Sequence, residues 1–423
     1  MIKTSIVILT HNQLEYTLRC LESIRLHTED YELILVDNGS TDGTAEVLLR
    51  SSFKTVLNPV NEGFAKGCNQ GLALAEGEYV LFLNNDTVVT PGWLNAMLRL
   101  FQDEPLCGMV GPVSNYVSGP QQIEAGYGPG VEGLEAFAAS RLPVWRNHCW
   151  ELPRLVGFCL LLRRSLAQQL GGFDERFGLG NYEDDDLCMR VSREGWRLLV
   201  ACDSFVHHYG HVTMNALEDF DLPGLLQRNK AIANSKWGDD LVDMLYRRVP
   251  TLSCAIGMGE SGDPESLERT LDSIIGFADE IMIIHYGGDE SWEAARRIGA
   301  QRDLKTVRAG RSETAGTITA LYEAGRDYVL WLRAGEELGQ EQGRRLMAVR
   351  RKLGLQAGTP LVALQLPDGS VAMRMALVGA RPEWDAEAGG YVLGGLMKAR
   401  ISGGGGGLAP VILSGLPGKE GPK

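Results

Sequence analysis

Residues 79–86 read Y-V-L-F-L-N-N-D, an apolar run that ends in Asn84, Asn85 and Asp86. The run has the composition of a buried strand, and open α/β sheets bind ligands at the carboxyl ends of their strands. A carboxylate beside amides at such an end suits a hard divalent cation whose other ligands are phosphate oxygens. We therefore predict a cation and diphosphate site at these three residues.

Polar side chains also follow two earlier strands. Thr10 and Asn12 end the first predicted strand, and Asp37 opens the loop D-N-G-S-T-D-G-T after the second. In a parallel sheet both ends face one crevice, where a carboxylate can accept a hydrogen bond from a base imide or a ribose hydroxyl. The alternative is a pair of solvated loops in which Thr41 or Asp42 caps the next helix.

The segment N-E-G-F-A at residues 61–65 opens the predicted third helix. Its amide groups can face a diphosphate at the helix N-terminus, with Asn61 beside it and Lys66 adding positive charge. Ordinary capping by Asn61 needs no ligand, and the sequence favours neither interpretation.

Four acids in a row, residues 183–186, begin another predicted helix. Acids interact favourably with the N-terminal end of a helix dipole, so electrostatic capping is the alternative to function. Four adjacent carboxylates exceed what capping needs, and crowding raises the pKa of at least one of them. A raised pKa makes a carboxylate a better base, so we predict that this cluster is catalytic.

Three histidines, His207, His208 and His211, follow the last predicted strand of the N-terminal half. One imidazole that completes the Asp86 metal site is the preferred interpretation. The H-x-x-x-H spacing also occurs in zinc helices, but a Tyr and a Gly lie inside it, which disfavours zinc. Hydrogen-bonded structural imidazoles remain the alternative for at least one of the three.

These side chains need a scaffold, and the N-terminal half alternates between strand and helix periods. Strands that alternate with helices indicate βαβ units and a largely parallel sheet, which is an α/β fold. Residues 105–150 are rich in Gly and Pro, and we interpret them as a substrate loop. The predicted strands are 6–10, 32–36, 53–57, 79–83, 155–163 and 197–206, and the predicted helices are 14–27, 65–75, 184–194 and one that begins at Pro91.

Length and composition limit the class of protein. The 423 residues favour two domains, and the net charge of −13 argues against a nucleic-acid partner. No apolar run approaches the roughly 18–20 residues of a membrane span. The N-terminus lacks the cleavage site of a signal peptide. Eight scattered cysteines without a C-x-x-C pair favour reduced thiols, and hence a cytoplasmic protein.

The second half resembles a degenerate copy of the first. Three short segments match at a nearly constant spacing of about 250 residues, which indicates an internal duplication. The alternative is the common rhythm of any two α/β domains. The matching segments are 271–274 with 21–24, 280–284 with 32–36, and 328–332 with 79–83.

The copy keeps its apolar core and loses its polar strand ends. Asp37 corresponds to His285, and residues 84–86 correspond to Arg333, Ala334 and Gly335, although two acids follow at 336–337. We predict a catalytic domain over residues 1–248, a degenerate non-catalytic domain over 249–401, and a flexible Gly/Pro-rich tail over 402–423.

Taken together and in order, the motifs of residues 1–235 resemble family 2 glycosyltransferases with the GT-A fold, a Rossmann-like sheet flanked by helices. The second half resembles a degenerate form of the same fold. The N-N-D sequence is similar to the variant in rhamnosyltransferase-like members. The motifs are S-I-V-I-L-T-H-N-Q, V-D-N-G-S-T-D-G-T, N-E-G-F-A, F-L-N-N-D, G-G-F-D-E-R-F, Y-E-D-D-D-L-C-M-R and V-H-H-Y-G-H-V-T.

The resemblance implies a role for each matching position. Asp184, the second acid of the family's E-D pair, would be the general base, with Glu183 beside it. Asp86 occupies the last place of the D-x-D motif and would bind Mn²⁺ or Mg²⁺. The other roles are nucleotide binding by Thr10, Asn12 and Asp37, metal ligation by His208 with His207 as the second choice, and contact with the sugar or acceptor by Trp93, Asp174 and Glu175.

The resemblance also implies an inverting transfer from a UDP-, dTDP- or GDP-linked sugar to the hydroxyl of a glycan, lipid-linked or protein acceptor. It implies bacterial polysaccharide or protein glycosylation in the cytoplasm, with peripheral contact at the inner face of the membrane. Asn84 stands where the family has the first acid of D-x-D, which removes one potential ligand.

Two alternatives remain open. One is a non-catalytic glycan- or nucleotide-sugar-binding scaffold built on a decayed transferase. The other, a sugar-phosphate nucleotidyltransferase, needs a Gly-rich basic loop after the first strand, and the sequence T-H-N-Q-L-E-Y disfavours it.

Overall fold

The computed structural model describes residues 3–128, 131–210, 221–260 and 262–355, together with the backbone of four later strands. The chain divides into two compact units, Met1–Arg247 and Arg248–Lys423. His211 and the predicted tail at 402–423 lie outside the described residues.

The first unit is built on a nine-stranded sheet with the order β3-β2-β1-β4-β8-β6-β9-β5, and β7 pairs with β9. Strands β1 to β4 are mutually parallel, and β8 is antiparallel to β4. The strands are β1 (Thr4–Thr10), β2 (Tyr31–Asn38), β3 (Lys54–Asn58), β4 (Tyr79–Asn84), β5 (Thr87–Val89), β6 (Cys107–Val113), β7 (Cys149–Glu151), β8 (Cys159–Arg163) and β9 (Arg197–His208).

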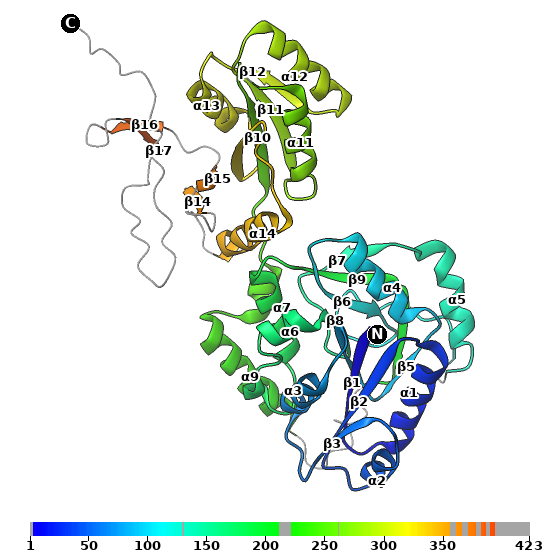
Figure 1. The fold of residues 1–423 in the computed structure, drawn as a ribbon. Helices are drawn as coiled ribbons and strands as arrows, with labels where there is room; N and C mark the ends of the chain where they lie inside the picture. Colours follow the sequence, from blue (N-terminus) through cyan, green and yellow to red (C-terminus); the bar gives the residue numbers. More distant parts are fainter. Residues whose placement is uncertain are drawn as a thin grey trace, which may run out of the picture. The chain divides into compact units, whose positions relative to one another are not determined.

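Helices cover both faces of this sheet (Figure 1). The side chains of Ile6 and Ile8 pack on one face against Cys20 of α1 and Met97 of α4. On the other face Gly67 and Gly71 of α3 lie against the sheet so closely that a Cβ would clash with Leu9 and Val7. The helices are α1 (Leu14–His27), α2 (Thr44–Leu49), α3 (Phe64–Leu74), α4 (Trp93–Asp103), α5 (Leu134–Trp145), α6 (Arg164–Gln169), α7 (Glu183–Arg193), α9 (Leu222–Trp237) and α10 (Leu241–Tyr246).

Every strand and helix predicted for this unit is present, but the structure adds unpredicted elements such as β5 and α6, and it differs from the prediction at two places. Residues 105–150 are not one long loop, because they contain the fully buried strand β6 and the helix α5. The Gly and Pro residues of β6 favoured the prediction of a loop, but the segment is a strand that pairs with β8 on one side and β9 on the other. The strand predicted from residue 155 begins only at Cys159.

The second unit has a six-stranded sheet with the order β12-β11-β10-β13-β15-β14. This order repeats β3-β2-β1-β4-β8-β6 of the first unit, and the change to antiparallel pairing falls at the same place. The elements are β10 (Leu252–Met258), α11 (Pro264–Ile274), β11 (Glu280–His285), α12 (Asp289–Gln301), β12 (Lys305–Arg308), α13 (Glu313–Glu323), β13 (Tyr328–Arg333), α14 (Gln340–Leu355), β14 (Leu361–Gln365) and β15 (Val371–Leu377), and β16 (Pro382–Asp385) pairs separately with β17 (Gly390–Leu393).

The register of the two sheets fixes which residues correspond. Thr10 lies opposite Asp37, and Met258 lies opposite His285. In the same way Leu9 pairs with Asn84, and Gly257 pairs with Arg333. Two of the three sequence matches, 280–284 with 32–36 and 328–332 with 79–83, therefore coincide with equivalent sheet positions, which supports the duplication.

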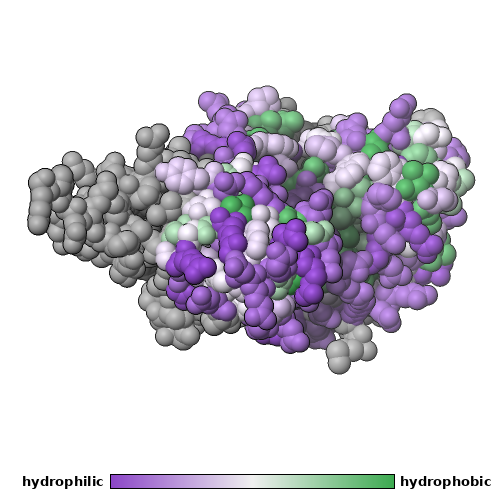
Figure 2. Space-filling model, turned by 90° about the horizontal axis from the view of Figure 1, so that it is seen from above, coloured by the Kyte–Doolittle hydropathy of each residue, from purple (hydrophilic) through white to green (hydrophobic). Residues whose placement is uncertain are grey.

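Within the described residues, no helix combines the length and the apolar character needed to cross a bilayer. Figure 2 shows one face of these residues, on which hydrophilic side chains predominate and hydrophobic ones form small separate groups.

Candidate active site

The carboxyl ends of β1, β2 and β4 meet at one edge of the first sheet, as their parallel register requires. A cleft of about 660 Å³ lies at this edge. Its lining includes eight of the residues predicted from the sequence, namely Thr10, Asn61, Asn84, Asn85, Asp86, Glu183, Asp184 and His208.

Asp86 and His208 form a buried pair in this cleft, with 3.2 Å between Asp86 Oδ1 and His208 Nε2. Asp86 directly precedes β5, and the antiparallel pairing of β5 with β9 sets Thr87 opposite His208. The backbone N–H of Tyr209 donates to the Asp86 carbonyl at 3.0 Å, which closes the same pairing. Two segments about 120 residues apart in sequence are thus joined by sheet pairing.

The His208 ring is held in one orientation. Nδ1 lies 2.8 Å from the Tyr116 carbonyl, and the ring stacks on Phe158 with centroids 5.1 Å apart. A carbonyl only accepts hydrogen bonds, so Nδ1 carries the proton, and in the neutral imidazole Nε2 presents its lone pair to the Asp86 carboxylate. Two electron-pair donors that face each other suit a cation between them.

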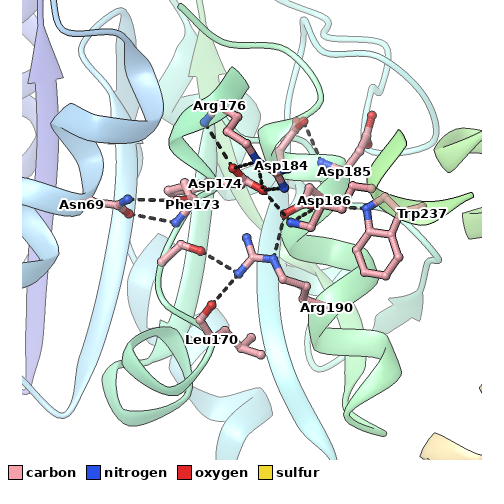
Figure 3. A network of polar contacts seen from close by, with 12 residues as sticks. Asn69, Leu170, Phe173, Asp174, Arg176, Asp184, Asp185, Asp186, Arg190 and Trp237 are labelled. Carbon is pink, nitrogen blue, oxygen red and sulfur yellow. Dashed lines mark hydrogen bonds and ion pairs between the residues drawn. The ribbon is translucent and has the colours of Figure 1, made fainter. Parts of the chain in front are cut away.

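The four acids of α7 point to different partners because successive helical residues are about 100° apart. Asp184 Oδ2 accepts from the Gly157 backbone N–H at 2.9 Å, and Asp185 is ion-paired with Arg154. Asp186 faces away from the cleft, where Arg190 Nε donates to it at 2.8 Å and Trp237 Nε1 at 2.9 Å (Figure 3). The row of acids is therefore divided between the cleft and the interior.

Burial raises the pKa of two of these acids. The pKa of Glu183 is raised well above its usual value by burial and by the neighbouring charge of Asp184. The pKa of Asp185 is raised to about 7 by burial and Asp184, although the guanidinium of Arg154 opposes the rise. The predicted rise is confirmed, with burial as a larger cause than crowding.

Adjacent residues connect the acid helix to the Asp86–His208 pair. Gly157 donates its N–H to Asp184, and the ring of the next residue, Phe158, stacks on His208. The Phe158 carbonyl in turn accepts from the Asn84 N–H at 2.9 Å. Gly157 and Phe158, which directly precede β8, thus hold both groups on one wall of the cleft.

The family described as Glycosyl transferase family 2 matches residues 5–171. An N-acetylglucosaminyl-diphospho-decaprenol L-rhamnosyltransferase of Mycobacterium tuberculosis is 30% identical over 239 residues, which cover 49% of this chain and 76% of the relative. The chain belongs to glycosyltransferase family 2. The O-antigen biosynthesis protein RfbC of Myxococcus xanthus is 30% identical over 197 residues, covering 42% of this glycosyltransferase and 15% of the relative.

Solved structures with a similar chain course include GalNAc-T7 with UDP, GalNAc and Mn²⁺. That structure has a TM-score of 0.44 and 17% identity, and the match covers 58% of this glycosyltransferase and 50% of the other chain.

Two predicted nucleotide-binding residues, Asp37 and Asn12, are not part of the cleft lining. Asp37 is only 2% exposed, and its carboxylate accepts from the Thr10 hydroxyl at 3.2 Å and from the Ser40 N–H at 3.0 Å. Asn12 Oδ1 accepts from the Thr41 N–H at 2.8 Å, which links the loops after β1 and β2. In this glycosyltransferase both side chains shape the loops around the cleft.

Lys66 and His207 also contact other partners. Lys66 is ion-paired with Glu62 at 2.6 Å. His207 Nδ1 lies 2.6 Å from the Tyr127 hydroxyl, and the imidazole borders a separate cavity. Burial lowers the pKa of His207 to about 4. Of the two histidines, His208 is the one that faces Asp86.

The acceptor contact predicted for Trp93 is wrong for this structure. Trp93 is fully buried in the core, and its indole N–H donates to the Thr28 hydroxyl at 3.0 Å, so no substrate can reach it. Asp174 and Glu175 are also engaged elsewhere. Lys236 is 2.7 Å from Asp174, and Asn69 donates to Glu175 at 3.0 Å.

Sequence reasoning missed Arg154, which lines the cleft. Its guanidinium pairs with Asp185 and donates to the Ser118 hydroxyl at 2.9 Å, so it connects the acid helix to the loop after β6. The one available signal was a lone Arg immediately before an apolar run, and such a residue more often ends in solvent.

The described residues contain no group of three or more His, Cys, Asp or Glu side chains arranged to hold a metal. Asp86 and His208 are a set of two. Mn²⁺ or Mg²⁺ with only two protein ligands would take its remaining ligands from diphosphate oxygens and water, as such ions commonly do at phosphate sites. The residues therefore fit a cation that binds together with a nucleotide.

Proposed function

We propose that this glycosyltransferase moves a sugar from a nucleotide-sugar to an acceptor hydroxyl in one inverting displacement. One observation carries the proposal. A single cleft is lined by the Asp86–His208 pair and by Asp184, and Gly157 and Phe158 connect the two. A charge-neutralising site beside a carboxylate base is the minimum that a direct displacement needs.

In the proposed step Asp184 accepts the acceptor's hydroxyl proton while that oxygen forms a bond to the anomeric carbon. The bond from the anomeric carbon to the diphosphate oxygen breaks, and the nucleoside diphosphate leaves with the electron pair. Backbone N–H donation from Gly157 and Asp185 holds the carboxylate of Asp184 in place. A single displacement inverts the anomeric configuration, so no nucleophilic residue is required.

Asp86 and His208 would hold Mn²⁺ or Mg²⁺ at this site. When bound, the cation supplies Lewis-acid stabilisation of the charge that grows on the departing diphosphate. Asn84 in place of an acid leaves fewer protein charges to hold the ion, so we propose that it binds tightly only together with the nucleotide.

The donor we propose is a UDP-, dTDP- or GDP-linked hexose or deoxyhexose. The acceptor is a glycan, a lipid-linked glycan or a protein, and the lipid-linked class is favoured by the name of the mycobacterial relative. A lipid-linked acceptor would bring this glycosyltransferase into peripheral contact with the cytoplasmic face of a membrane.

The second unit is proposed to do no chemistry. At the edge of its sheet the positions of Thr10, Asp37 and Asn84 are taken by Met258, His285 and Arg333. None of these three is the hydroxyl, carboxylate or amide oxygen that a nucleotide–cation site uses.

The proposal is tested by a donor screen. Purified protein with Mn²⁺ is incubated with UDP-, dTDP- and GDP-sugars and with lipid-linked or glycan acceptors, and release of nucleoside diphosphate is measured. We expect release from one nucleotide class that depends on the cation and is faster with the acceptor present. Binding of a nucleotide-sugar without release or transfer from any donor would instead favour a non-catalytic binding scaffold.

A further inference from the structure

The segment that precedes α7, the helix that carries Asp184, is conformationally strained. Residues 178–182 include four with positive φ, Gly178 at 61°, Gly180 at 122°, Asn181 at 69° and Tyr182 at 76°. A bulky residue such as Tyr182 rarely adopts this conformation, so surrounding contacts must hold it. Three of these four residues, together with Leu179, line the cleft.

The strained segment is continuous with α7. The Asp186 backbone N–H donates to the Tyr182 carbonyl at 2.9 Å, which is the first turn of the helix. Tyr182 therefore supplies the first hydrogen-bond acceptor of the helix that carries Asp184. Any rotation of Tyr182 would shift the first turn, and with it the carboxylate.

Asn229 of α9 holds this segment by hydrogen bonds to its backbone carbonyls. The side chain is fully buried, and its Nδ2 lies 2.8 Å from the Phe177 carbonyl, 2.8 Å from that of Gly180 and 3.0 Å from that of Asn181. An amide nitrogen has two hydrogens, so the three carbonyls share them. Without this donor, buried carbonyls would lose a partner at the point where the backbone is strained.

The C-terminal end of α9 also holds the first turn of α7. Lys236 Nζ is 2.6 Å from Asp186 Oδ1, and Trp237 Nε1 donates to the same oxygen at 2.9 Å. Figure 3 shows Trp237 reaching Asp186 from one side and Arg190 reaching it from the other. Helix α9 thus contacts both the backbone that precedes Asp184 and the carboxylate of Asp186, two residues after it.

We propose that α9 is the element that positions the base, with Asn229 as its principal positioning residue. Asn229 is too deeply buried to touch a substrate, so it acts through residues 177–181 on the orientation of Asp184. The proposal rests on the proposed function, because it assigns α9 a part in the same transfer. It adds a role for residues 222–237, which lie beyond the family match at 5–171.

The test compares Asn229→Leu with Gln227→Leu. Both replace an amide by a side chain of similar size on the same helix, but Gln227 is exposed. We expect Asn229→Leu to lower kcat roughly 10- to 100-fold, as a displacement of about 1 Å at a reacting group does. The KM for the donor should stay within about 2-fold, since Asp86 and His208 are placed by the pairing of β5 with β9 and not by α9. Amide hydrogen exchange should become faster in peptides that cover residues 177–187.

Trp237→Phe serves as a second variant in case Asn229→Leu does not fold. It removes the N–H that is donated to Asp186 and keeps an aromatic ring, although a smaller one. A loss of one such bond should lower kcat by several-fold, roughly 3- to 10-fold, with an unchanged donor KM. Gln227→Leu should match wild type in all three measurements.

Unchanged exchange in residues 177–187 would overturn the proposal, and so would faster exchange there with wild-type kcat. Loss of kcat together with donor affinity and protection throughout the first unit would also overturn it, since that pattern is general destabilisation. If the wild type turns over no donor, the proposed function fails by itself. The exchange experiment then still decides whether Asn229 holds the segment, because faster exchange confined to residues 177–187 supports the contact.

Discussion

The two units of this chain keep the same scaffold and differ at its functional edge. Several side-chain hydrogen bonds occur at equivalent places in both sheets. In each unit a Ser of the first strand donates to a Glu of the second strand, and a Ser near the end of the first helix accepts from a backbone N–H that follows the fourth strand. The pairs are Ser5–Glu32 with Ser253–Glu280, and Ser23–Val89 with Ser273–Leu338.

The edge that carries the cleft in the first unit is occupied differently in the second. There, Arg333 Nε donates to Glu313 at 2.7 Å, and the Trp331 ring stacks with Tyr286 at 6.2 Å between centroids. His285, the counterpart of Asp37, is buried against Ser291. These side chains contact neighbouring side chains of the same unit, whereas those of the first unit surround a cleft.

The difference shows which interactions the fold requires. Buried strands and the hydrogen bonds beneath them persist in both units because their loss would cost stability directly. Strand-end side chains lie at the edge of the sheet and not in its apolar centre, so they can change without unfolding the sheet. A scaffold can therefore lose its site and keep its topology.

The largest effect that separates the units is expected from Asp184→Asn. An amide cannot accept the acceptor's proton, so turnover should fall by roughly 10²–10⁴ while nucleotide binding is retained. Release of nucleoside diphosphate measures turnover, and calorimetry measures binding. Glu337→Gln, an acid-to-amide change in the second unit, should leave both unchanged. Wild-type turnover by Asp184→Asn would remove Asp184 as the base.

Asp86→Ala should weaken cation-dependent nucleotide binding. It removes one of the two protein ligands proposed for the ion, and we expect affinity for a nucleoside diphosphate in Mn²⁺ to fall at least 10-fold, a loss already seen for weaker perturbations of metal sites. The matched control is Glu336→Ala, which follows Gly335, the counterpart of Asp86. Calorimetry with and without Mn²⁺ checks the result. Equal affinity of the wild type in both conditions would show that nucleotide binding does not depend on the cation.

Much of this site could be predicted from the sequence because its residues lie where strands end. The apolar runs of β1, β2 and β4 predict parallel strands, and parallel register brings Thr10 and Asn84 to one edge. The pairing of Asp86 with one of the histidines was the preferred interpretation of the sequence, and the resemblance singled out His208. It depends on β5, a strand of three residues that pairs with β9.

The failures concern contacts made at long range. Trp93 stands near the site in sequence, but α4 packs against β9 and takes the indole into the core. No local pattern distinguishes Asp186, which α9 neutralises from inside, from Asp184, which faces the cleft. The sequence pattern predicts which elements exist. The direction in which each acidic side chain points depends on contacts with helices that lie tens of residues later in the chain.

Ser23→Ala and Ser273→Ala should destabilise their own units by similar amounts. Each substitution leaves a backbone N–H without its side-chain acceptor, at Val89 or at Leu338, which costs about 1–3 kcal/mol when the group is buried. Hydrogen exchange resolved by peptide measures the loss in each unit separately. Thr55→Ala, at an exposed hydroxyl near the sheet edge, is the control. Markedly unequal losses would mean that the two scaffolds are not energetically equivalent.

The smallest effect is expected in the response of the second unit to acid. Burial and the nearby Arg308 guanidinium lower the pKa of His285, so the unfolded chain binds this proton more tightly than the folded one. Stability is therefore full above the ordinary histidine pKa of about 6.5 and declines as the pH falls below it. Protonation would also turn both ring nitrogens into donors. Nε2 already meets the Ser291 hydroxyl at 2.8 Å, and Nδ1 has no hydrogen-bond partner among the described residues.

His285→Asn should remove this part of the acid response. The free energy of unfolding of the second unit, followed by hydrogen exchange between pH 5 and pH 8, should then vary less with pH than in the wild type. Replacing His27, a half-buried histidine of the first unit whose Nε2 lies 3.2 Å from Glu135 Oε1, should leave the second unit's response unchanged. An identical pH slope in His285→Asn and wild type would show that His285 does not titrate there. The edge of the second sheet would then have exchanged a carboxylate for an imidazole without acquiring sensitivity to pH.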